Sequence, residues 1–441
     1  MNTKPVNEIN SQQGQVLDPS NRESMEYDVL IVGAGPAGLS AAIKIKQLAK
    51  KNDLDISVCV LEKASEIGAH ILSGAVIETV ALDKLLPNWQ DMDSPIKTKV
   101  TKDKLSYFGK NWSVNIPNFL LPPLMKNHGN YIVSLGNVCK WLGEVAESLG
   151  VEVYPGFSAA EVLIDEDDKV YGVATGDMGV SKDGLAKDSW ESGMELHAKY
   201  TLFSEGARGS LSKFLIDNFE LSKESDHQKY AIGIKELWEV KEENHQEGLV
   251  EHSMGWPLSE GTGGGSFLYH FGQNLVSIGY VVHLNYTNPY VSPFDEFQQF
   301  KTHPSIKKIL EGGKRISYGA RAITAGGFQS VPKLFFPGGA LIGCSAGFLN
   351  YPKIKGTHNA MESGILAAES IIENFLSENQ NNDLFNYQEK YESSRIAKEL
   401  KKVRNVKPFQ SRYGVFLGTI LSGIDMWLNT FGITLPFTLS H

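Results

Sequence analysis

A short apolar run followed by glycines opens the first regular part of the chain. Residues 29–32 read Val-Leu-Ile-Val, a continuous aliphatic run of the kind that forms a strand buried on both faces of a parallel sheet. Gly33, Gly35 and Gly38 follow, and an Ala-rich helical pattern occupies 39–45. The pattern predicts a strand, a tight turn and a helix in succession.

The same alternation of apolar strands and amphipathic helices continues over residues 25–104 and resumes over 131–225. Further predicted elements are a strand at 56–61, a helix at 137–149, strands near Glu152 and Lys169, and a long helix that starts near Gly356. Strands that alternate with helices are typical of an α/β fold with a parallel sheet.

A proline-rich apolar segment, NWSVNIPNFLLPPLMKNHG at 111–129, interrupts this alternation. Its three prolines exclude a regular helix or a central strand. The apolar side chains of the segment are Trp112, Ile116, Phe119, Leu120, Leu121, Leu124 and Met125. We expect such a loop either to be buried under another part of the protein or to press into a partner.

From about 226 to 315 the pattern alternates with period two and is rich in aromatic residues, which predicts an antiparallel sheet in a second domain. The overall expectation is a mixed α/β fold in which a Rossmann-like domain carries an inserted antiparallel sheet.

The glycines after the first strand predict a dinucleotide site. They permit a tight turn and a close approach of the backbone to a pyrophosphate, while the helix N-terminus directs free N–H groups at the phosphates. Glu62 ends the second strand, where an acidic side chain would accept hydrogen bonds from ribose hydroxyls.

Two later motifs favour a flavin over a nicotinamide. TLFSEGARGSLSK places Glu205 and Gly206 after a strand, and LFFPGGALIGCSAGF runs from a strand into a glycine turn. A flavin needs this additional backbone to cover its ribityl chain and ring. Many FAD proteins have Gly-Asp in the third motif, whereas this chain has Gly343 and Cys344.

Composition narrows the classes of function. The net charge of -9 argues against a nucleic-acid partner, and 41% hydrophobic residues are ample for a large core. Cys59, Cys139 and Cys344 are too scattered to indicate a disulfide framework or a metal site. Residues 1–24 have no apolar segment and are predicted to be a disordered leader rather than a signal peptide.

Several runs make the chain resemble the electron transfer flavoprotein-ubiquinone oxidoreductase family over roughly residues 25 to 440. They are IGAHILSGA, NHGNYIVSLG, GWPLSEGTGGGSFLYH, HPSIKKILEGGKRISYGARAI and PGGALIGCSAGFLNYPKIKGTHNAMESGILAAES, the last of which includes the Gly-Cys departure that is characteristic of this family. The resemblance implies an FAD enzyme on one leaflet of an energy-conserving membrane, with electron transfer flavoprotein and ubiquinone as partners in the respiratory chain.

The resemblance also assigns residues. The fingerprint falls on Val29 to Ile43, and the FAD-binding residues that we expect are Val29, Gly33, Ala34, Gly35, Pro36, Ala37, Gly38, Glu62, Glu205, Gly206, Gly343, Cys344 and Gly347. The quinone-binding pair falls on Gly264 and Gly265, whose bare backbone N–H groups suit a quinone carbonyl. Taken without the resemblance, the pair is more simply a hairpin turn.

The family normally carries a [4Fe–4S] cluster on four cysteines in a ferredoxin-like domain, and three scattered cysteines cannot supply those ligands. Either the sequence is a fragment, or a separate ferredoxin holds the cluster, as in related flavoproteins. An FAD monooxygenase or a prenyl reductase would use the same flavin motifs and is the alternative activity. No other metal site is expected.

Near the C-terminus, YGVFLGTILSGIDMWLNTFGITLPF follows a basic stretch. Its apolar residues Leu417, Ile420, Leu421, Ile424, Leu428 and Phe431 recur at helical spacing, and the basic residues before it are Lys398, Lys401, Lys402, Arg404, Lys407 and Arg412. Asp425 interrupts the run, so we expect a helix that lies in a membrane surface without spanning it. The loop at 112–126 would be a second membrane contact.

The resulting division has four parts. We expect a leader at 1–24, an FAD-binding domain at 25–104, 129–225 and 316–376, a quinone-binding, membrane-facing domain at 105–128 and 226–315, and a C-terminal helical segment at 377–441. The predicted location is the cytoplasmic face of a bacterial inner membrane, or the mitochondrial inner membrane in a eukaryote.

Overall fold

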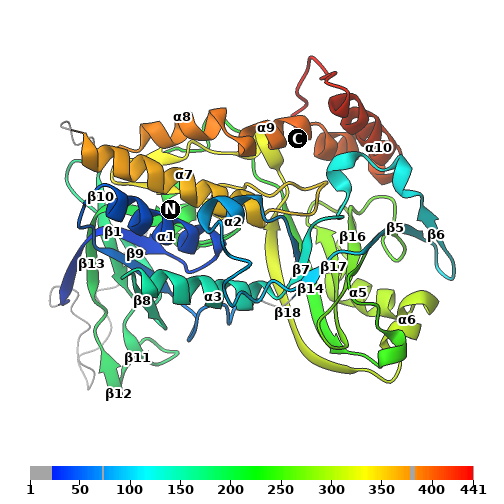
Figure 1. Ribbon diagram of the computed structural model, residues 1–441, viewed down its shortest axis with the longest axis horizontal. Helices are drawn as coiled ribbons and strands as arrows, with labels where there is room; N and C mark the ends of the chain where they lie inside the picture. The colour runs from blue at the N-terminus through cyan, green and yellow to red at the C-terminus, as the bar shows by residue number, and fades with distance from the viewer. Residues whose placement is uncertain (1–21, 72–73, 378–382, 441) are drawn as a thin grey trace.

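The computed structural model describes residues 22–71, 74–377 and 383–440. The predicted leader therefore lies almost entirely outside the described residues. Two large sheets, one on each side of the molecule in Figure 1, organise the described part of the chain.

The first sheet has eight strands and contains β1 (Ser24–Val32) at its centre. Its neighbours β2 (Val58–Glu62) and β13 (Glu195–Phe203) run parallel to it, because a helix returns the chain between strands. The sheet is completed by β8 (Glu152–Pro155), β9 (Ala159–Ile164), β10 (Val170–Thr175), β19 (Phe335–Phe336) and β20 (Gly339–Leu341).

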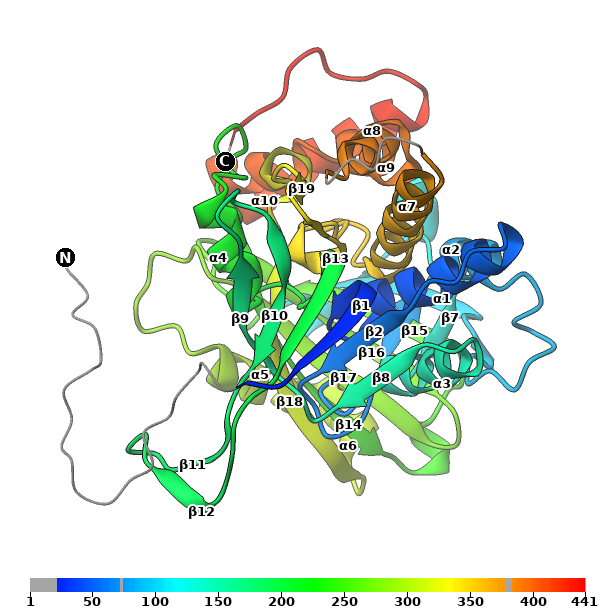
Figure 2. The same ribbon diagram turned by 90° about the vertical axis from the view of Figure 1, so that its left-hand side faces the viewer.

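Three helices form a layer on one face of this sheet. α1 (Pro36–Lys51) packs between α7 (Thr357–Leu376) and α3 (Leu135–Ser148), and all three lie in front of the strands in Figure 1 and to one side of them in Figure 2. α2 (Val80–Leu85) lies beside α7, and α4 (Ser210–Asn218) follows β13. The predicted helix at 137–149 is α3, and the helix predicted from Gly356 is α7.

The second sheet has seven strands in the order β18-β14-β17-β16-β15-β5-β6. Their bounds are β5 (Lys102–Phe108), β6 (Ser113–Ile116), β14 (Tyr230–Glu239), β15 (Leu249–Gly255), β16 (Gly264–Phe271), β17 (Leu275–His283) and β18 (Lys314–Thr324). α5 (Pro293–Thr302) and α6 (Pro304–Leu310) supply Phe297, Phe300 and Ile306 to the core on one face. A small three-stranded sheet contains β3 (Ala75–Ile77), β7 (Tyr131–Val133) and β4 (Thr98–Lys99) in that order. A two-stranded sheet contains β11 (Met178–Val180) and β12 (Ala186–Glu191).

Two details of this sheet differ from the sequence-based expectation. β5 runs parallel to β15, so the predicted antiparallel sheet contains one parallel pair. The sequence assigns residues from 316 onward to the FAD-binding domain, but they lie in β18, which pairs with β14 of the second sheet along its whole length. β5 begins at Lys102, before the predicted domain boundary at 105. Local alternation marks these strands but does not reveal their partners, which are distant in sequence. The mixed α/β fold class itself is confirmed.

The C-terminal helices α8 (Phe385–Ser393), α9 (Arg395–Lys402) and α10 (Val406–Thr430) run along the upper edge of the molecule in Figure 1. α10 is two helical pieces joined at Gly414, whose φ of 78° is in the left-handed region that glycine tolerates. Within the described residues, no helix is both long enough and apolar enough to cross a bilayer.

Candidate functional site

The glycines between β1 and α1 have different surroundings. A Cβ added to Gly33 would lie 2.7 Å from the Ser204 carbonyl oxygen, and one added to Gly38 would lie 2.1 Å from the Gly33 carbonyl oxygen. These two glycines are therefore needed for close packing of the turn. A Cβ on Gly35 would meet no atom within 4 Å, so the space beside Gly35 is open.

Gly35 is also the N-cap residue of α1, and no described side chain caps this helix. The first N–H groups of a helix need a partner, and an uncapped N-terminus beside open space is suited to an anion. Pro36 occupies the first turn, where its missing N–H costs nothing. The turn thus fits the pyrophosphate of a dinucleotide.

The buried strand and helix residues of the fingerprint support this turn. Val29 is buried in β1, Ala34 is buried in the turn that follows it, and Ala37 is buried on α1. A Cβ placed on Gly343 would lie 2.8 Å from that of Ala37, so the third motif packs directly on the first helix turn.

Glu62 has backbone partners in this structure. Its carboxylate accepts hydrogen bonds from the N–H of Ala34 at 3.1 Å and from the N–H of Ala64 at 2.8 Å. The side chain therefore holds the glycine turn against the end of β2. A carboxylate has further lone pairs, so these bonds leave acceptor capacity for a ribose hydroxyl.

Glu205, which we expected to contact FAD, forms hydrogen bonds within the protein in this structure. Its carboxylate accepts from the Ser212 N–H at 2.6 Å and from the Ser212 hydroxyl at 2.7 Å, and so satisfies the N-terminus of α4. Gly206 has a φ of 87° and open space around its missing side chain. The Gly206 carbonyl accepts from Ser345 at 3.3 Å, which joins the second motif to the third.

The third motif is a short turn of 3₁₀ helix, Gly343–Ser345. Gly343 has a φ of 63° and donates its N–H to Ser363 on α7 at 2.9 Å, and Gly347 has a φ of 84°. Burial raises the pKa of the Cys344 thiol to about 11, so this side chain is a neutral thiol at the position where many FAD proteins have an Asp.

Strand register brings the motifs together. Val32 at the end of β1 pairs with Phe203 at the end of β13, and Phe203 pairs with Leu341 at the end of β20. The carboxyl ends of parallel strands meet at one edge, where open α/β sheets bind their ligands. All three predicted FAD motifs therefore lie at one edge of the first sheet.

Gly264 and Gly265 lie in the other sheet and begin β16, so they are not a hairpin turn. A Cβ on Gly264 would lie 2.1 Å from the Val281 carbonyl oxygen, and one on Gly265 would lie 2.5 Å from the Ser253 carbonyl oxygen. Bare backbone at this position is thus required by strand packing.

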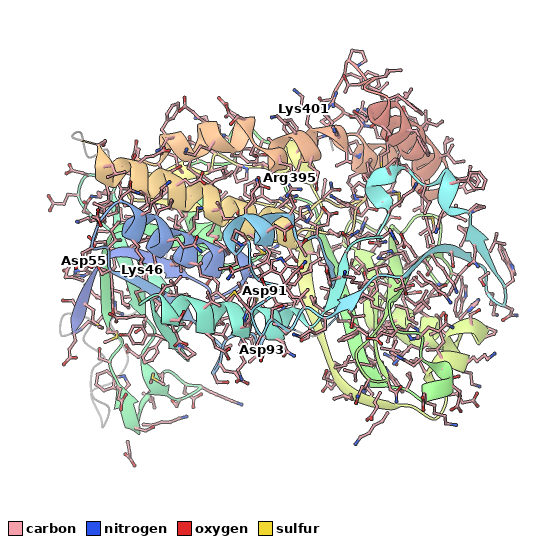
Figure 3. The ribbon with its side chains drawn as sticks, in the orientation of Figure 1. Lys46, Asp55, Asp91, Asp93, Arg395 and Lys401 are labelled. Carbon is pink, nitrogen blue, oxygen red and sulfur yellow. The ribbon has the colours of Figure 1, made fainter. Side chains whose placement is uncertain are left out.

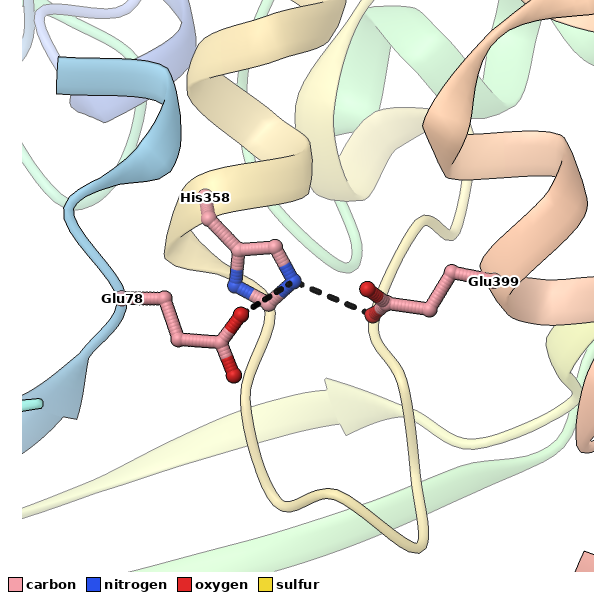
Figure 4. Close-up of side chains that lie close together, drawn as sticks. All are labelled: Glu78, His358 and Glu399. Atoms are coloured by element: carbon pink, nitrogen blue, oxygen red, sulfur yellow. Dashed lines mark hydrogen bonds and ion pairs between the residues drawn. The ribbon is translucent and has the colours of Figure 1, made fainter. Parts of the chain in front are cut away.

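A buried ionic cluster, which the sequence did not reveal, joins three distant segments. His358 at the start of α7 is fully buried, and its Nε2 lies 3.0 Å from Glu399 on α9 and 3.9 Å from Glu78 after β3 (Figure 4). Lys353 lies 2.8 Å from Glu78 and 3.1 Å from Glu399. Burial alone would raise the pKa of Glu399, but the hydrogen bond from His358 and the charges of His358 and Lys353 lower it well below its usual range.

Glu78, His358 and Glu399 are close enough to share a metal ion. The ammonium group of Lys353 already forms an ion pair with each carboxylate, so the geometry does not require a metal ion. The expectation that no metal is bound stays a prediction. The spacing of the three residues along the chain gave no signal for the cluster, because each comes from a different element.

Part of α10 exposes apolar side chains. Phe416 on α10 and Phe431 directly after it are 65% and 72% exposed, and Leu417, Ile420 and Ile424 are also exposed. The buried residues of α10 include Gly418, Ser422, Asp425 and Asn429 as well as the apolar Val406, Phe409 and Met426. Burial raises the pKa of the Asp425 carboxyl, while Arg404 and Asn429 act against this shift.

The 3₁₀ turns at 118–125 lie next to α10, because the Trp427 indole N–H donates to the Leu120 carbonyl at 2.9 Å. Phe119 is 74% exposed, and Trp112, Val114 and Leu120 are exposed as well. Leu124 and Met125 instead pack against Val403 and Met426. Each segment therefore presents apolar side chains on the same part of the surface.

The predicted basic residues near α10 do not all reach solvent. Arg404 and Lys407 are buried, whereas Lys398, Lys401, Lys402 and Arg412 are exposed. Lys401 lies on α9 close to the start of α10 in Figure 3. The charge available to a membrane surface is accordingly smaller than the sequence suggests.

Family models match two parts of the chain. The model described as ETF-QO, ubiquinone-binding matches residues 230–323, which span β14 to β18, and an NAD(P)-binding Rossmann-like domain matches residues 31–97. Among solved structures, the chain is similar to a geranylgeranyl bacteriochlorophyll reductase-like protein from Thermoplasma acidophilum, with a TM-score of 0.64 and 17% identity over 93% of this chain and 97% of that one. A flavin-dependent brominase has a TM-score of 0.61 and 17% identity over 92% of this chain and 90% of that one. At these identities the likeness concerns the fold.

Curated relatives are much closer in sequence. The electron transfer flavoprotein-ubiquinone oxidoreductase of Caenorhabditis elegans mitochondria is 53% identical over 95% of this chain and 71% of the relative. The human mitochondrial protein is 52% identical over 95% of this chain and 69% of the relative, and the Pseudomonas aeruginosa protein is 51% identical over 95% of this chain and 76% of the relative. Because these identities extend over nearly the whole chain, it belongs to the electron transfer flavoprotein-ubiquinone oxidoreductase family.

Proposed function

We propose that this chain is an oxidoreductase that takes electrons from reduced electron transfer flavoprotein and passes them through FAD to ubiquinone. The observation that carries this proposal is the identity of 51% to 53% to relatives of that name over 95% of the chain. The match of residues 230–323 to the ubiquinone-binding model agrees with it.

Bound FAD would supply the redox chemistry, since flavins accept and release electrons one or two at a time. The open space at Gly35 and the uncapped α1 suit its pyrophosphate, and Glu62 is suited to its ribose. Val29, Ala34 and Ala37 hold the turn in shape, while Gly206, Gly343, Cys344 and Gly347 border the ribityl and ring end. Glu205 would act through α4, which its carboxylate caps.

Gly264 and Gly265 are the residues that we assign to the quinone head group. They begin β16, in which Phe267 and Tyr269 pack in one apolar cluster and Leu268 packs in another. We place this site in the domain built on the seven-stranded sheet, and the FAD site in the domain built on the eight-stranded sheet.

Membrane association is part of the proposal. The exposed apolar faces of α10 and of the 3₁₀ turns at 118–125 adjoin one another, and the exposed lysines Lys398, Lys401 and Lys402 lie on α9, which precedes α10. Such a surface suits a monotopic contact with anionic lipid, from which quinone would enter. We propose the cytoplasmic face of a bacterial inner membrane, or the inner membrane of a mitochondrion.

A [4Fe–4S] cluster in the electron path would need ligands other than the cysteines of this sequence. Cys59 and Cys139 are buried in β2 and α3, and Cys344 lies in the third flavin motif. We propose that such a cluster, held outside residues 1–441, mediates transfer from electron transfer flavoprotein.

The quinone half of the reaction can be tested separately. We expect FAD-loaded protein that has been reduced with dithionite to be reoxidised rapidly by a short-chain ubiquinone under anaerobic conditions, and to be inert to NADPH. Rapid bleaching of the flavin by NADPH, with no reoxidation by quinone, would instead assign the chain to the monooxygenase or prenyl reductase alternative.

The electron-input half needs its own measurement. Reduced electron transfer flavoprotein should transfer electrons slowly to the chain alone and rapidly when a family ferredoxin-like domain is added. Equal rates without that domain would remove the cluster from the proposed path.

A further inference from the structure

A lysine and a histidine are buried together at the junction of α10 and the seven-stranded sheet. Lys407 on α10 is 5% exposed and His283 at the end of β17 is 1% exposed. The Lys407 ammonium donates to His283 Nδ1 and, at 3.4 Å, to the side-chain oxygen of Asn285. Within the described part of the chain, no carboxylate forms an ion pair with Lys407.

The histidine ring lies against the turn that precedes the proposed quinone glycines. The backbone N–H of His283 donates to the Gly263 carbonyl at 2.9 Å. A Cβ added to Gly263 would lie only 2.7 Å from His283 Nδ1, so a side chain at 263 would displace the ring. Gly264 and Gly265 follow directly.

A tyrosine from the third flavin motif region completes the surroundings. The Tyr351 ring meets His283 edge-on with centroids 5.0 Å apart, and its hydroxyl donates to Gln410 at 2.7 Å. Tyr351 precedes α7 in the same segment as Cys344. The Lys407–His283 pair therefore lies between segments of the two proposed sites.

The charges around the pair set its protonation. Burial lowers the pKa of Lys407 to about 8, and the like charge of Lys229 adds to this effect. Burial, followed by the charge of Lys407, lowers the pKa of His283 to about 3. Arg404 lines the same small cavity as Lys407 and Tyr351. At neutral pH the lysine is charged and the imidazole is neutral.

This protonation fixes the tautomer of the histidine. An ammonium group has donors only, so Nδ1 must accept and the ring proton resides on Nε2. Asn285 is exposed, which places the other hydrogen-bond partner of Lys407 at the surface. Lys407 thus joins the exposed Asn285 to the ring beside Gly263 by hydrogen bonds.

We propose that Lys407 and His283 deliver the protons for quinone reduction, an inference that rests on the proposed function. Reduction to the quinol takes two electrons, which that function supplies through the flavin, and two protons. For each proton, an N–H bond of Lys407 breaks as one forms at His283 Nδ1. The Nε2–H bond breaks as an O–H bond forms on the quinone. Before the second transfer the starting state is restored: Nδ1 returns its proton to the Lys407 amine, and water protonates Nε2.

The test uses the full-length, FAD-loaded protein, reduced with dithionite and mixed with short-chain ubiquinone across the pH range. In the parent, reoxidation should slow as pH rises through about 8, because the donor loses its proton. Lys407→Arg keeps the charge but cannot release a proton, so its rate should fall at least tenfold and lose the alkaline limb. Flavin content serves as the folding control.

Lys229→Gln is a matched variant that removes only the neighbouring like charge. Its alkaline limb should move to higher pH while the rate at neutral pH is unchanged. Parental rates and an unchanged pH profile in Lys407→Arg would overturn the proton route. Failure of the parent to reduce quinone at any pH would instead overturn the proposed function on which it rests.

A readout without turnover separates a proton-carrying role from a structural one. In ¹⁵N NMR of histidine-labelled protein, the His283 Nδ1 signal should shift as Lys407 titrates near pH 8, and this shift should be absent in Lys407→Arg. A His283 signal that is insensitive to pH in that range would also contradict the proposal.

Discussion

Gly35 and Gly38 belong to one motif but serve different purposes. Gly38 lacks a side chain because the Gly33 carbonyl fills the space, whereas Gly35 borders open space. Its φ of -87° is also one that any residue adopts. A substitution at Gly35 should therefore affect binding of the cofactor, whereas a substitution at Gly38 should affect folding.

We expect Gly35→Val to fold with a thermal unfolding temperature close to that of the parent but to contain less than a tenth of its FAD, since the valine side chain would occupy the space beside the uncapped helix. Absorbance at the flavin band and calorimetry measure the two properties. Full flavin content in this variant would contradict the pyrophosphate assignment.

The control is Gly38→Ala, in which a single methyl group meets backbone. It should lower the unfolding temperature or abolish soluble expression, because overpacking against rigid atoms typically costs 1–3 kcal/mol or more. A stable Gly38→Ala protein would show that this turn is less tightly packed than the structure indicates.

Individual site residues were only partly predictable. The glycines, Glu62 and the Gly343–Cys344 departure are visible as local patterns next to strands. The cap that Glu205 forms on α4 depends on Ser212, seven residues away in the following helix, and the His283–Lys407 pair joins β17 to α10. Contacts between elements produce no regular spacing of residue types along the sequence, so these contacts could not be predicted from periodicity.

At the scale of elements, the ionic cluster of Figure 4 fixes α9 to α7 and to the end of β3. The lowered pKa of Glu399 means that its charged form is more stable in the folded protein than in the unfolded chain. This contribution is complete above the ordinary pKa of 4.5 and is lost as pH falls below it.

Glu399→Gln should therefore destabilise the protein by roughly 3 kcal/mol at pH 7, because it leaves Lys353 and His358 with one carboxylate fewer. The difference from the parent should shrink as pH falls below about 4.5, by at most about 1.4 kcal/mol per pH unit. Urea unfolding at several pH values measures both quantities.

Glu392→Gln on α8 is the matched control, since Glu392 is exposed and contacts only Gln388 by a side-chain hydrogen bond among the described residues. It should change stability by less than about 0.5 kcal/mol. An equal effect of the two substitutions would mean that the cluster does not anchor α9.

Elements were predicted better than their partners. Helices α3 and α7 and the central strands carry strong local periodicity, and their positions agree with expectation. The position of α10 was also predicted, but not its kink at Gly414 or the burial of Arg404 and Lys407. Those features depend on what α10 packs against, which the sequence pattern does not contain.

At the scale of the whole molecule, the exposed faces of α10 and the 3₁₀ turns form one apolar surface. Transfer of a leucine or isoleucine side chain out of water is worth about 1.5–3 kcal/mol. Leu417→Glu/Ile424→Glu should therefore weaken binding to phosphatidylcholine–phosphatidylglycerol vesicles by at least a hundredfold while FAD content stays unchanged. Co-sedimentation measures the affinity.

Phe214→Glu provides the comparison, because Phe214 is an exposed apolar residue of α4, outside this surface. It should leave vesicle binding at the parental level. Loss of binding in this variant, or retention in the double variant, would place the membrane contact elsewhere.

The strand order of the first sheet has a consequence for synthesis of the protein. β1 emerges early from the ribosome, yet its partner β13 comes much later, and β20 must add to β13 before the sheet edge is complete. Parallel pairing between such distant segments is slow, and the unpaired apolar strand is prone to aggregate. One edge of β1 therefore stays without its native partner until residue 203 has been translated, whereas β2 can cover the other edge as soon as residue 62 has emerged.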